Sequence, residues 1–167
     1  MTALHWGTVS TVSATGRRLD SWVAFLRAHS AITHQLNADL LVAHGLTLND
    51  YEVLLRLSHA ERGMMRRVDL AESVVLTASG ITRLLDGLER AGLVEKAACS
   101  ADARVSYAKL TAAGRQRLEE AAATHLAGVD ELFSARFTSS ELDSLAELLS
   151  RLPLSGKACF GERACGE

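Results

Sequence analysis

The sequence predicts a mainly α protein with one small β-hairpin, and three observations support this fold class. Hydrophobic residues make up 48% of the 167 residues and aromatic residues only 5%, with alanine and leucine dominant, which favours the packing of helices. The one proline, Pro153, lies close to the end of the chain, so most of the sequence is free of this helix breaker. Two strand-like runs, residues 93–98 and 105–110, flank a small polar loop that is typical of a hairpin.

The N-terminal part begins with a loose segment and continues as helices. Residues 1–16 are rich in Ser, Thr and Gly without periodicity and are predicted to form a flexible arm. In residues 17–45 the apolar residues recur at intervals of three and four, which predicts a long amphipathic helix ending at a glycine. Thr47 is expected to cap a second helix that carries Asp50 in its first turn. Residues 64–67 are predicted to add a short strand to the hairpin.

A pair of short helices is predicted next. Residues 68–74 form the first, and the second begins after Thr77, a natural N-cap. The second helix would bury one face through apolar residues at helical spacing: Ile81, Leu84, Leu85 and Leu88. Thr82 and Arg83 lie on the opposite face, and Gly92 is expected to end the helix in the left-handed conformation. Short polar side chains and an Arg near the start of a helix that is anchored by aliphatic residues are typical of a DNA recognition helix.

Two further helices are predicted after the hairpin. Thr111 is expected to cap a helix that runs to about residue 135. Residues 138–141 form a capping box that starts the last helix, which Pro153 would stop. Residues 153–167 are predicted to form a flexible tail.

This order of elements predicts a winged helix-turn-helix with long terminal dimerisation helices. The paired helices and the hairpin, or wing, assign the winged domain to residues 46–110. The helical parts, residues 17–45 and 111–152, have wide apolar stripes but little globular body to cover. They are expected to pack against the same helices of a second copy, giving a two-fold homodimer. The alternative is a three-helix cluster within a monomer.

Charge is distributed unevenly along the chain. The formal net charge is −2, but residues 62–117 hold ten basic and six acidic residues, so this stretch carries +4 and the remainder −6. A basic middle between acidic ends places positive charge on the predicted DNA-binding region. A random fluctuation of solvated surface charge is the alternative.

Six short motifs, in this order and spacing, resemble the MarR family of transcription regulators, and the flanking helices also fit. The motifs are Gly45-Leu46-Thr47, Asp69-Leu70-Ala71, Gly80-Ile81-Thr82-Arg83-Leu84, Gly92-Leu93-Val94, Asp102-x-Arg104 and Leu110-Thr111-x-x-Gly114. The resemblance implies a homodimer joined through its terminal helices. It also implies a response to a small, often aromatic acid that binds between the dimer helices and the DNA-binding region.

The start of the predicted recognition helix supplies the candidate major-groove contacts, which are Thr77, Ser79, Gly80, Thr82 and Arg83. Hydroxyl groups suit phosphates or base edges, and Arg can bind guanine through two hydrogen bonds. Thr77 and Ser79 could instead serve only as caps. Arg83 could instead form a surface ion pair with Asp86 or Glu89.

The wing and its surroundings supply further candidate contacts. The resemblance implies that Arg104 enters the minor groove, where a narrow A·T geometry concentrates negative potential. Asp102 is expected to orient Arg104, or alternatively to act as a turn residue of the hairpin. Lys96, Arg66 and Arg67 are predicted to contact phosphates without reading sequence.

No effector-pocket motif of the family transfers residue by residue to this sequence. Trp22, Arg27 and His29 on the first long helix are candidate ligand-binding residues, with Arg27 as an anchor for a carboxylate. Core packing for Trp22 and a solvated charge for Arg27 are the alternatives.

The sequence gives little support to metal or catalytic chemistry. The histidines show no HxxxH spacing and no CxxC occurs, so neither a metal site nor a cofactor is predicted. Cys99, Cys159 and Cys165 suggest thiols in a reducing compartment, and a thiol-based redox sensor acting through Cys99 is an alternative function. GxSxG, HExxH and phosphate-loop motifs are absent, so the chain is not expected to be an enzyme.

The sequence therefore predicts a transcription regulator that binds double-stranded DNA. It would repress as a homodimer on a palindromic operator and be released by a small effector. No apolar run approaches the roughly 20 residues of a membrane span and no signal pattern is found, so a cytoplasmic location without membrane partners is expected. The alternative from another class is a winged-helix interaction module that does not bind DNA.

Overall fold

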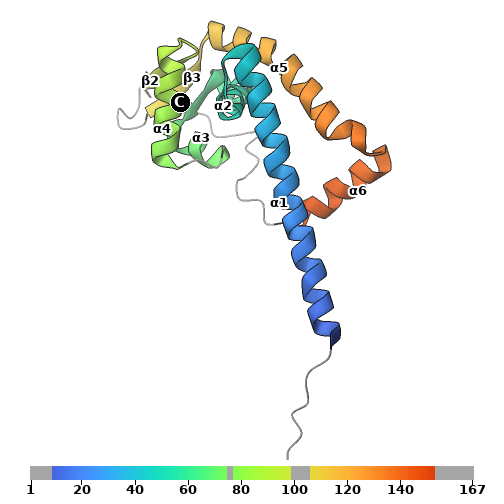
Figure 1. Ribbon diagram of the computed structural model, residues 1–167. Helices are drawn as coiled ribbons and strands as arrows, with labels where there is room; N and C mark the ends of the chain where they lie inside the picture. The colour runs from blue at the N-terminus through green and yellow to red at the C-terminus, as the bar shows by residue number, and fades with distance from the viewer. Residues whose placement is uncertain (1–8, 75–76, 99–105, 153–167) are drawn as a thin grey trace, which may run out of the picture.

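The computed structural model describes residues 9–74, 77–98 and 106–152, which form a head with a long helical stalk (Figure 1). The elements of the head are α2 (Leu48–His59), β1 (Met64–Arg66), α3 (Arg67–Ser73), α4 (Ala78–Arg90), β2 (Val94–Ala98) and β3 (Ser106–Leu110). The stalk consists of α1 (Val9–His44), α5 (Ala112–Leu132) and α6 (Ser139–Ser150). Single 3₁₀ turns, η1 (Glu61–Gly63) and η2 (Ser134–Arg136), precede β1 and follow α5.

The three strands form one antiparallel sheet in the order β1-β3-β2. Val94 of β2 pairs with Leu110 of β3, and Met64 of β1 pairs with Lys109 on the other side of the same strand. The predicted hairpin is therefore confirmed, and so is the short strand that precedes α3 and joins the sheet.

Threonine side chains start four of the helices as predicted. Thr47, Thr77, Thr111 and Thr138 each accept a hydrogen bond from a backbone N–H of the first helical turn. Two of the four are full capping boxes, in which Asp50 or Glu141 binds back to the cap backbone. At the helix ends, Gly45 (φ 67°) and Gly92 (φ 72°) adopt the left-handed conformation that glycine reaches without a Cβ penalty.

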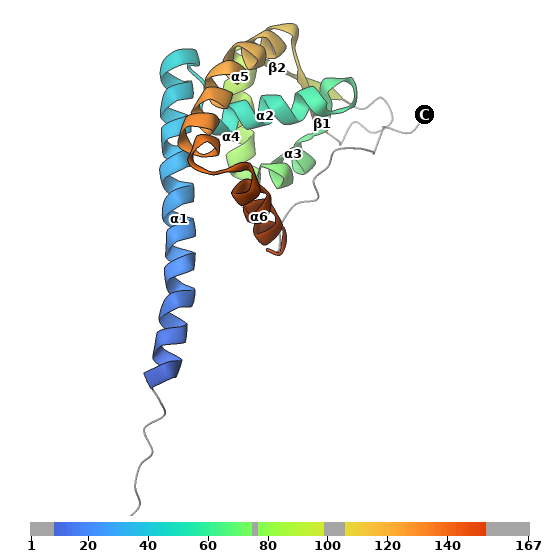
Figure 2. The same ribbon diagram turned by 90° about the vertical axis from the view of Figure 1, so that its right-hand side faces the viewer.

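The core lies in the head, where α2, α3 and α4 pack around leucines without solvent exposure: Leu54, Leu57, Leu70 and Leu85. Leu40 of α1 and Leu118 of α5 are part of the same cluster, so both stalk helices are anchored to the head. Figure 2 shows that α1 extends well beyond the head, and α6 carries no buried residue. The stalk therefore exposes apolar surface that the head does not cover.

The helix boundaries differ from the prediction at several points. The first helix begins at Val9, so residues 9–16, expected in the arm, are helical. This segment lacks proline, and its Ser, Thr and Val residues each cost only a few tenths of a kcal/mol in a helix, so an established helix can extend through it. The helix after Thr111 ends at Leu132, and α6 ends at Ser150, ahead of the predicted stop. Pro153 and the rest of the predicted tail, like residues 1–8, lie outside the described residues.

One joint connects the end of α4, the start of β2 and the start of α5. The Leu93 carbonyl accepts from the backbone N–H of Thr111 at 3.1 Å, and the Thr111 hydroxyl lies within hydrogen-bond distance of the Gly92 and Leu93 carbonyls. The same hydroxyl caps α5 by accepting from the N–H of Gly114 at 3.0 Å. A Cβ on Gly114 would lie 2.0 Å from the Leu93 oxygen, so α5 approaches this carbonyl more closely than any other residue type allows.

Gly114→Ala is therefore expected to lower the free energy of unfolding by about 1–3 kcal/mol, because the backbone must move to accommodate the methyl group. Urea unfolding followed by circular dichroism measures the change. Gly87→Ala is the matched control: a Cβ there meets nothing within 4 Å, and alanine should stabilise α4 by about 0.5–1 kcal/mol. Equal stability of wild type and Gly114→Ala would contradict the close approach.

Candidate nucleic-acid interface

The outer face of α4 carries the side chains that the sequence assigned to the major groove. Ile81, Leu85 and Leu88 are buried against the head, whereas Ser79, Thr82 and Arg83 are exposed. Thr77 accepts from the N–H of Gly80 at 3.1 Å and its hydroxyl lies 3.2 Å from that of Ser79. Thr77 is thus a cap, as in the alternative interpretation, and Ser79 remains next to it on the exposed end of the helix.

Arg83 does not form the surface ion pair that was its alternative role. No carboxylate of the described residues lies within 4.0 Å of its guanidinium group, and its side chain is exposed. The candidate partners, Asp86 and Glu89, face Arg67 instead. Arg83 is therefore a free cation on the outer face of α4, as far as residues 9–74, 77–98 and 106–152 are concerned.

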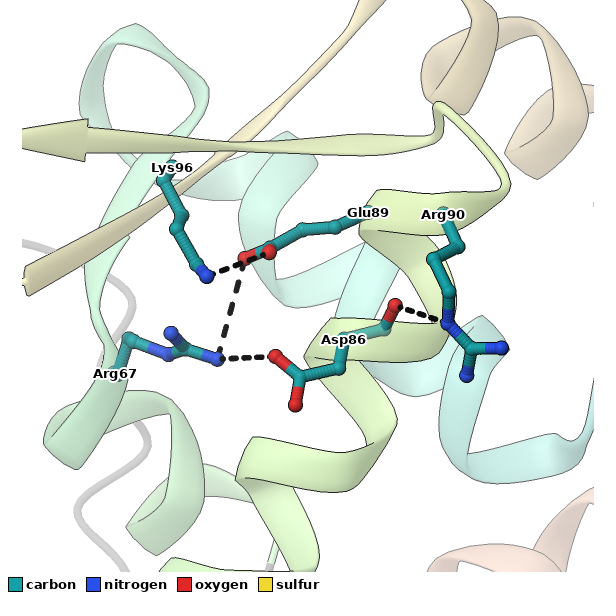
Figure 3. A network of polar contacts seen from close by, with 5 residues as sticks. All are labelled: Arg67, Asp86, Glu89, Arg90 and Lys96. Atoms are coloured by element: carbon teal, nitrogen blue, oxygen red, sulfur yellow. Dashed lines mark hydrogen bonds and ion pairs between the residues drawn. The ribbon is translucent and has the colours of Figure 1, made fainter.

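Two of the three predicted phosphate contacts belong to an ion-pair network beside α4 (Figure 3). Arg67 Nη2 lies 3.7 Å from Asp86 Oδ1 and 4.0 Å from Glu89 Oε1, and Lys96 Nζ lies 3.2 Å from Glu89 Oε2. Arg90 lies on the other side of the helix and donates from Nε to the Asp86 carbonyl at 3.1 Å. We call Arg67, Asp86, Glu89 and Lys96 the brace. Sequence reasoning missed it, although Asp86 and Glu89 at i, i+3 on one helix were a visible signal.

The third predicted phosphate contact is also paired. Arg66 donates from Nε and Nη2 to the two carboxylate oxygens of Asp69, both at 2.6 Å. The hydrogen bonds that Arg66 donates to Asp69, together with the negative charge of that carboxylate, raise the pKa of Arg66. This pair is exposed, so a phosphate group could still compete for the guanidinium.

The tip of the wing lies outside the described residues, and with it Asp102 and Arg104. The strands that lead to it are described: β2 and β3 pair from Val94 and Leu110 to Ala98 and Ser106. The roles of Asp102 and Arg104 at the minor groove stay predictions.

The candidate effector residues lie on the free part of α1. Trp22 stacks on Phe25 with ring centroids 6.1 Å apart, and Phe25 lies 6.4 Å from the His29 ring. The side chain of Trp22 is 56% exposed, so the chain by itself does not use it as a core residue. Arg27 is exposed as well. The structure thus places Phe25 between the rings of Trp22 and His29. The roles of Trp22, Arg27 and His29 in ligand binding stay predictions.

The histidine His125 of α5 sits at the contact between stalk and head. Its ring lies 4.5 Å from that of the buried Tyr51, and its Nδ1 is buried without a hydrogen-bond partner. Burial lowers the pKa of His125 and raises that of Tyr51, because each loses hydration of its charged form. Nearby, the His44 Nε2 lies 2.8 Å from the Thr124 hydroxyl, which ties α1 to α5.

Among the described residues, no three His, Cys, Asp or Glu side chains come together as metal ligands would. Within the same part of the chain, no helix is long and apolar enough to cross a membrane.

Comparison with known proteins decides the family. Residues 44–105 match the model of the MarR family. The structure of AbsC, a MarR family transcriptional regulator from Streptomyces coelicolor, is 32% identical and superposes with a TM-score of 0.72, covering 87% of this chain and 93% of AbsC. The chain belongs to the MarR family of transcriptional regulators.

Two further regulators are similar to this chain over most of their length. The transcriptional regulator MhqR from Bacillus subtilis (strain 168) is 28% identical over 143 residues, which are 86% of this chain and 96% of MhqR. Another MarR family regulator from Streptomyces coelicolor, solved in complex with DNA, is 24% identical with a TM-score of 0.77, covering 90% of this chain and 89% of that one. This last likeness shows the fold. The predicted fold class, a mainly α winged helix-turn-helix, is confirmed, and the relatives are regulators and not enzymes.

The buried ring of His125 predicts a pH dependence of stability. Because its pKa is lowered in the folded protein, the unfolded chain binds the proton more readily below about pH 6.5. The associated stability is present above that pH and is lost as the pH falls toward the folded-state pKa.

His125→Phe keeps a ring against Tyr51 and removes the titration. The free energy of unfolding, measured in urea at pH 7.5 and pH 5.5, should fall less on acidification for the variant than for wild type. The other histidines are the same in both proteins, so the difference reports on His125. An identical fall in both proteins would show that His125 does not titrate differently on folding.

Proposed function

We propose that this MarR-family chain represses transcription by binding a palindromic operator in double-stranded DNA as a homodimer, and that a small effector releases it. The observation that carries the proposal is the exposed polar face of α4, where Arg83 stands without an ion-pair partner among the described residues. The relative solved in complex with DNA shares the fold and supports this use of the winged domain. The cytoplasm is its proposed place of action.

The contacts follow from the geometry of α4. Ser79 and Arg83 are one helical turn apart on its exposed face, so both can reach the same stretch of a major groove. Arg83 is proposed to bind guanine through two hydrogen bonds, with Thr82 and the cap Thr77 near base edges or phosphates. Arg104 of the wing is proposed to enter the adjacent minor groove.

Arg83→Ala is expected to weaken operator binding by about 1–3 kcal/mol and to relax the preference at one base position of each half-site. The operator is first obtained by selecting bound sequences from a random duplex pool at fixed salt, and the variant is then passed through the same selection.

Arg90→Ala is the matched control. It removes the same charge from the C-terminal end of the same helix, where Arg90 donates a hydrogen bond to a backbone carbonyl. It should retain the selected sequence. If Arg83→Ala and wild type select the same sequence with equal affinity, α4 does not read DNA through Arg83.

The homodimer rests on the apolar surface of the stalk. Five of the exposed large apolar residues of α1 lie within eight positions: Leu19, Trp22, Val23, Phe25 and Leu26. Two more, Leu41 and Val42, are exposed near the C-terminal end of the helix. On the other two stalk elements, Leu126 of α5 and Leu148 of α6 are more than half exposed. In a two-fold dimer, the stalk helices of each protomer would bury the exposed apolar residues of the other. The dimer would also hold the two heads at a fixed separation. Half-sites one helical turn apart are then expected.

The effector is proposed to act on that separation. A small acid bound near Trp22, Arg27 and His29 would change the angle between the heads, so that both no longer fit adjacent major grooves. A coupling of about 1–3 kcal/mol is enough to switch occupancy.

Leu148→Glu is expected to shift the protein from dimer to monomer at micromolar concentration, because it places a charge in the proposed interface. Sedimentation velocity measures the change. Val68→Glu is the control: Val68 is somewhat more exposed than Leu148 but lies on α3 of the head, so its replacement should leave the dimer intact. A dimer that survives Leu148→Glu unchanged would contradict an interface through α6.

A further inference from the structure

The brace connects the three elements that surround the proposed DNA-binding face. Glu89, in the last turn of α4, contacts Lys96 of β2 through Oε2 at 3.2 Å and Arg67, the first residue of α3, through Oε1 at 4.0 Å. Asp86, three residues earlier, lies 3.7 Å from the same Arg67 nitrogen. One carboxylate of the recognition helix thus contacts both the strand that leads into the wing and the helix that supports α4 (Figure 3).

The centre of the brace is largely withdrawn from solvent. The side chains of Arg67 and Glu89 are each 18% exposed, and the facing atoms, Arg67 Nη2 and Glu89 Oε1, are buried without a hydrogen-bond partner. Each charge is therefore compensated by the other and by their outer neighbours. Removing either one leaves the other with only its outer neighbour, Asp86 for Arg67 or Lys96 for Glu89, which is costly for a charge that is largely withdrawn from solvent.

The charges of the brace cancel. Two cations, Arg67 and Lys96, face two carboxylates, so the group adds no net charge to the DNA-binding side of the head. This contrasts with Arg83, which has no carboxylate within 4.0 Å among the described residues. Arg67 and Lys96 are two of the three residues, with Arg66, that the sequence had assigned to phosphate contacts.

We propose that Glu89 is a positioning residue for DNA recognition, and that Arg67 and Lys96 serve it by fixing the wing and α3 against the recognition helix. The inference rests on the proposed function. A winged domain binds the major groove through α4 and the minor groove through the wing at once, so the angle between these elements sets whether both contacts form. The brace joins α4 to β2, the strand that leads into the wing, and so restricts the angle between them.

A test follows from the sign of the effect. Glu89→Gln removes a negative charge near DNA and releases two cations, so a purely electrostatic role predicts tighter binding and a steeper salt dependence. Positioning predicts the opposite: weaker operator binding, by about tenfold if one hydrogen bond to the operator is lost. Fluorescence anisotropy with the selected operator, at several salt concentrations, measures both the affinity and the slope.

Glu95→Gln is the matched control. Glu95 precedes Lys96 on β2 and makes an exposed pair with Lys109 of β3 at 2.8 Å, so the same change in charge occurs in the wing without touching the brace. Its operator affinity should equal or exceed that of wild type. Tighter binding by Glu89→Gln, or an equal loss in both variants, would overturn the proposal.

Lys96→Gln gives a second test that does not depend on a buried charge, because Lys96 is 62% exposed and the variant is expected to fold. As a positioning residue it should lose affinity while the salt slope stays that of wild type. A slope lower by about one would mark Lys96 as a phosphate contact and overturn its assignment to the brace.

A measurement without DNA separates the brace from the proposed function. Amide hydrogen exchange in the free protein should become faster in β2 for Glu89→Gln than for Glu95→Gln, with α6 unchanged in both. If wild type selects no DNA sequence but this difference is present, the proposed function fails while the brace stands as a structural link. If exchange in β2 is the same in both variants, Glu89 does not hold the wing.

Discussion

The close approach of α5 to the Leu93 carbonyl is the constraint on which the rest of the structure depends. At this one oxygen the exit of α4, the start of the sheet and the cap of α5 meet, and only Gly114 leaves room for the backbone of the helix. Thr111 completes the joint, because the same hydroxyl that caps α5 also lies against the Gly92 and Leu93 carbonyls. The orientation of α4 is thereby tied directly to the stalk. This joint is a direct route by which a movement of α5 reaches the recognition helix.

The sequence was sufficient for the elements that local chemistry decides. Thr47, Thr77, Thr111 and Thr138 each mark a helix start, since a side-chain cap depends on residues three positions apart. The exposed face of α4 follows from the spacing of its leucines in the same way. The winged fold could be predicted because these local signals occur in one consistent order.

What the sequence could not give depends on how elements face one another. Arg67 and Lys96 are surface cations by composition, and only the packing of α3 and β2 on α4 brings them to Glu89. The same holds for Trp22, which is apolar enough for a core but has no part of its own chain to cover it. The number of basic residues in the sequence therefore overstates the number of unpaired cations, because four of the six acids of residues 62–117 pair with cations of the same stretch: Asp69, Asp86, Glu89 and Glu95.

The unusual length of α1 has a mechanical consequence. At 1.5 Å per residue its 36 residues span about 54 Å, and within residues 19–44, the part whose burial is described, the buried side chains are Leu36 and Leu40 near the C-terminal end. Such a helix is held in the head near its C-terminal end and extends well beyond the head at its other end. A rotation of about 5° at the head moves the far end, about 40 Å away, by about 3.5 Å if the helix is rigid. Conversely, the far end offers leverage: a small force there exerts a large torque on the head.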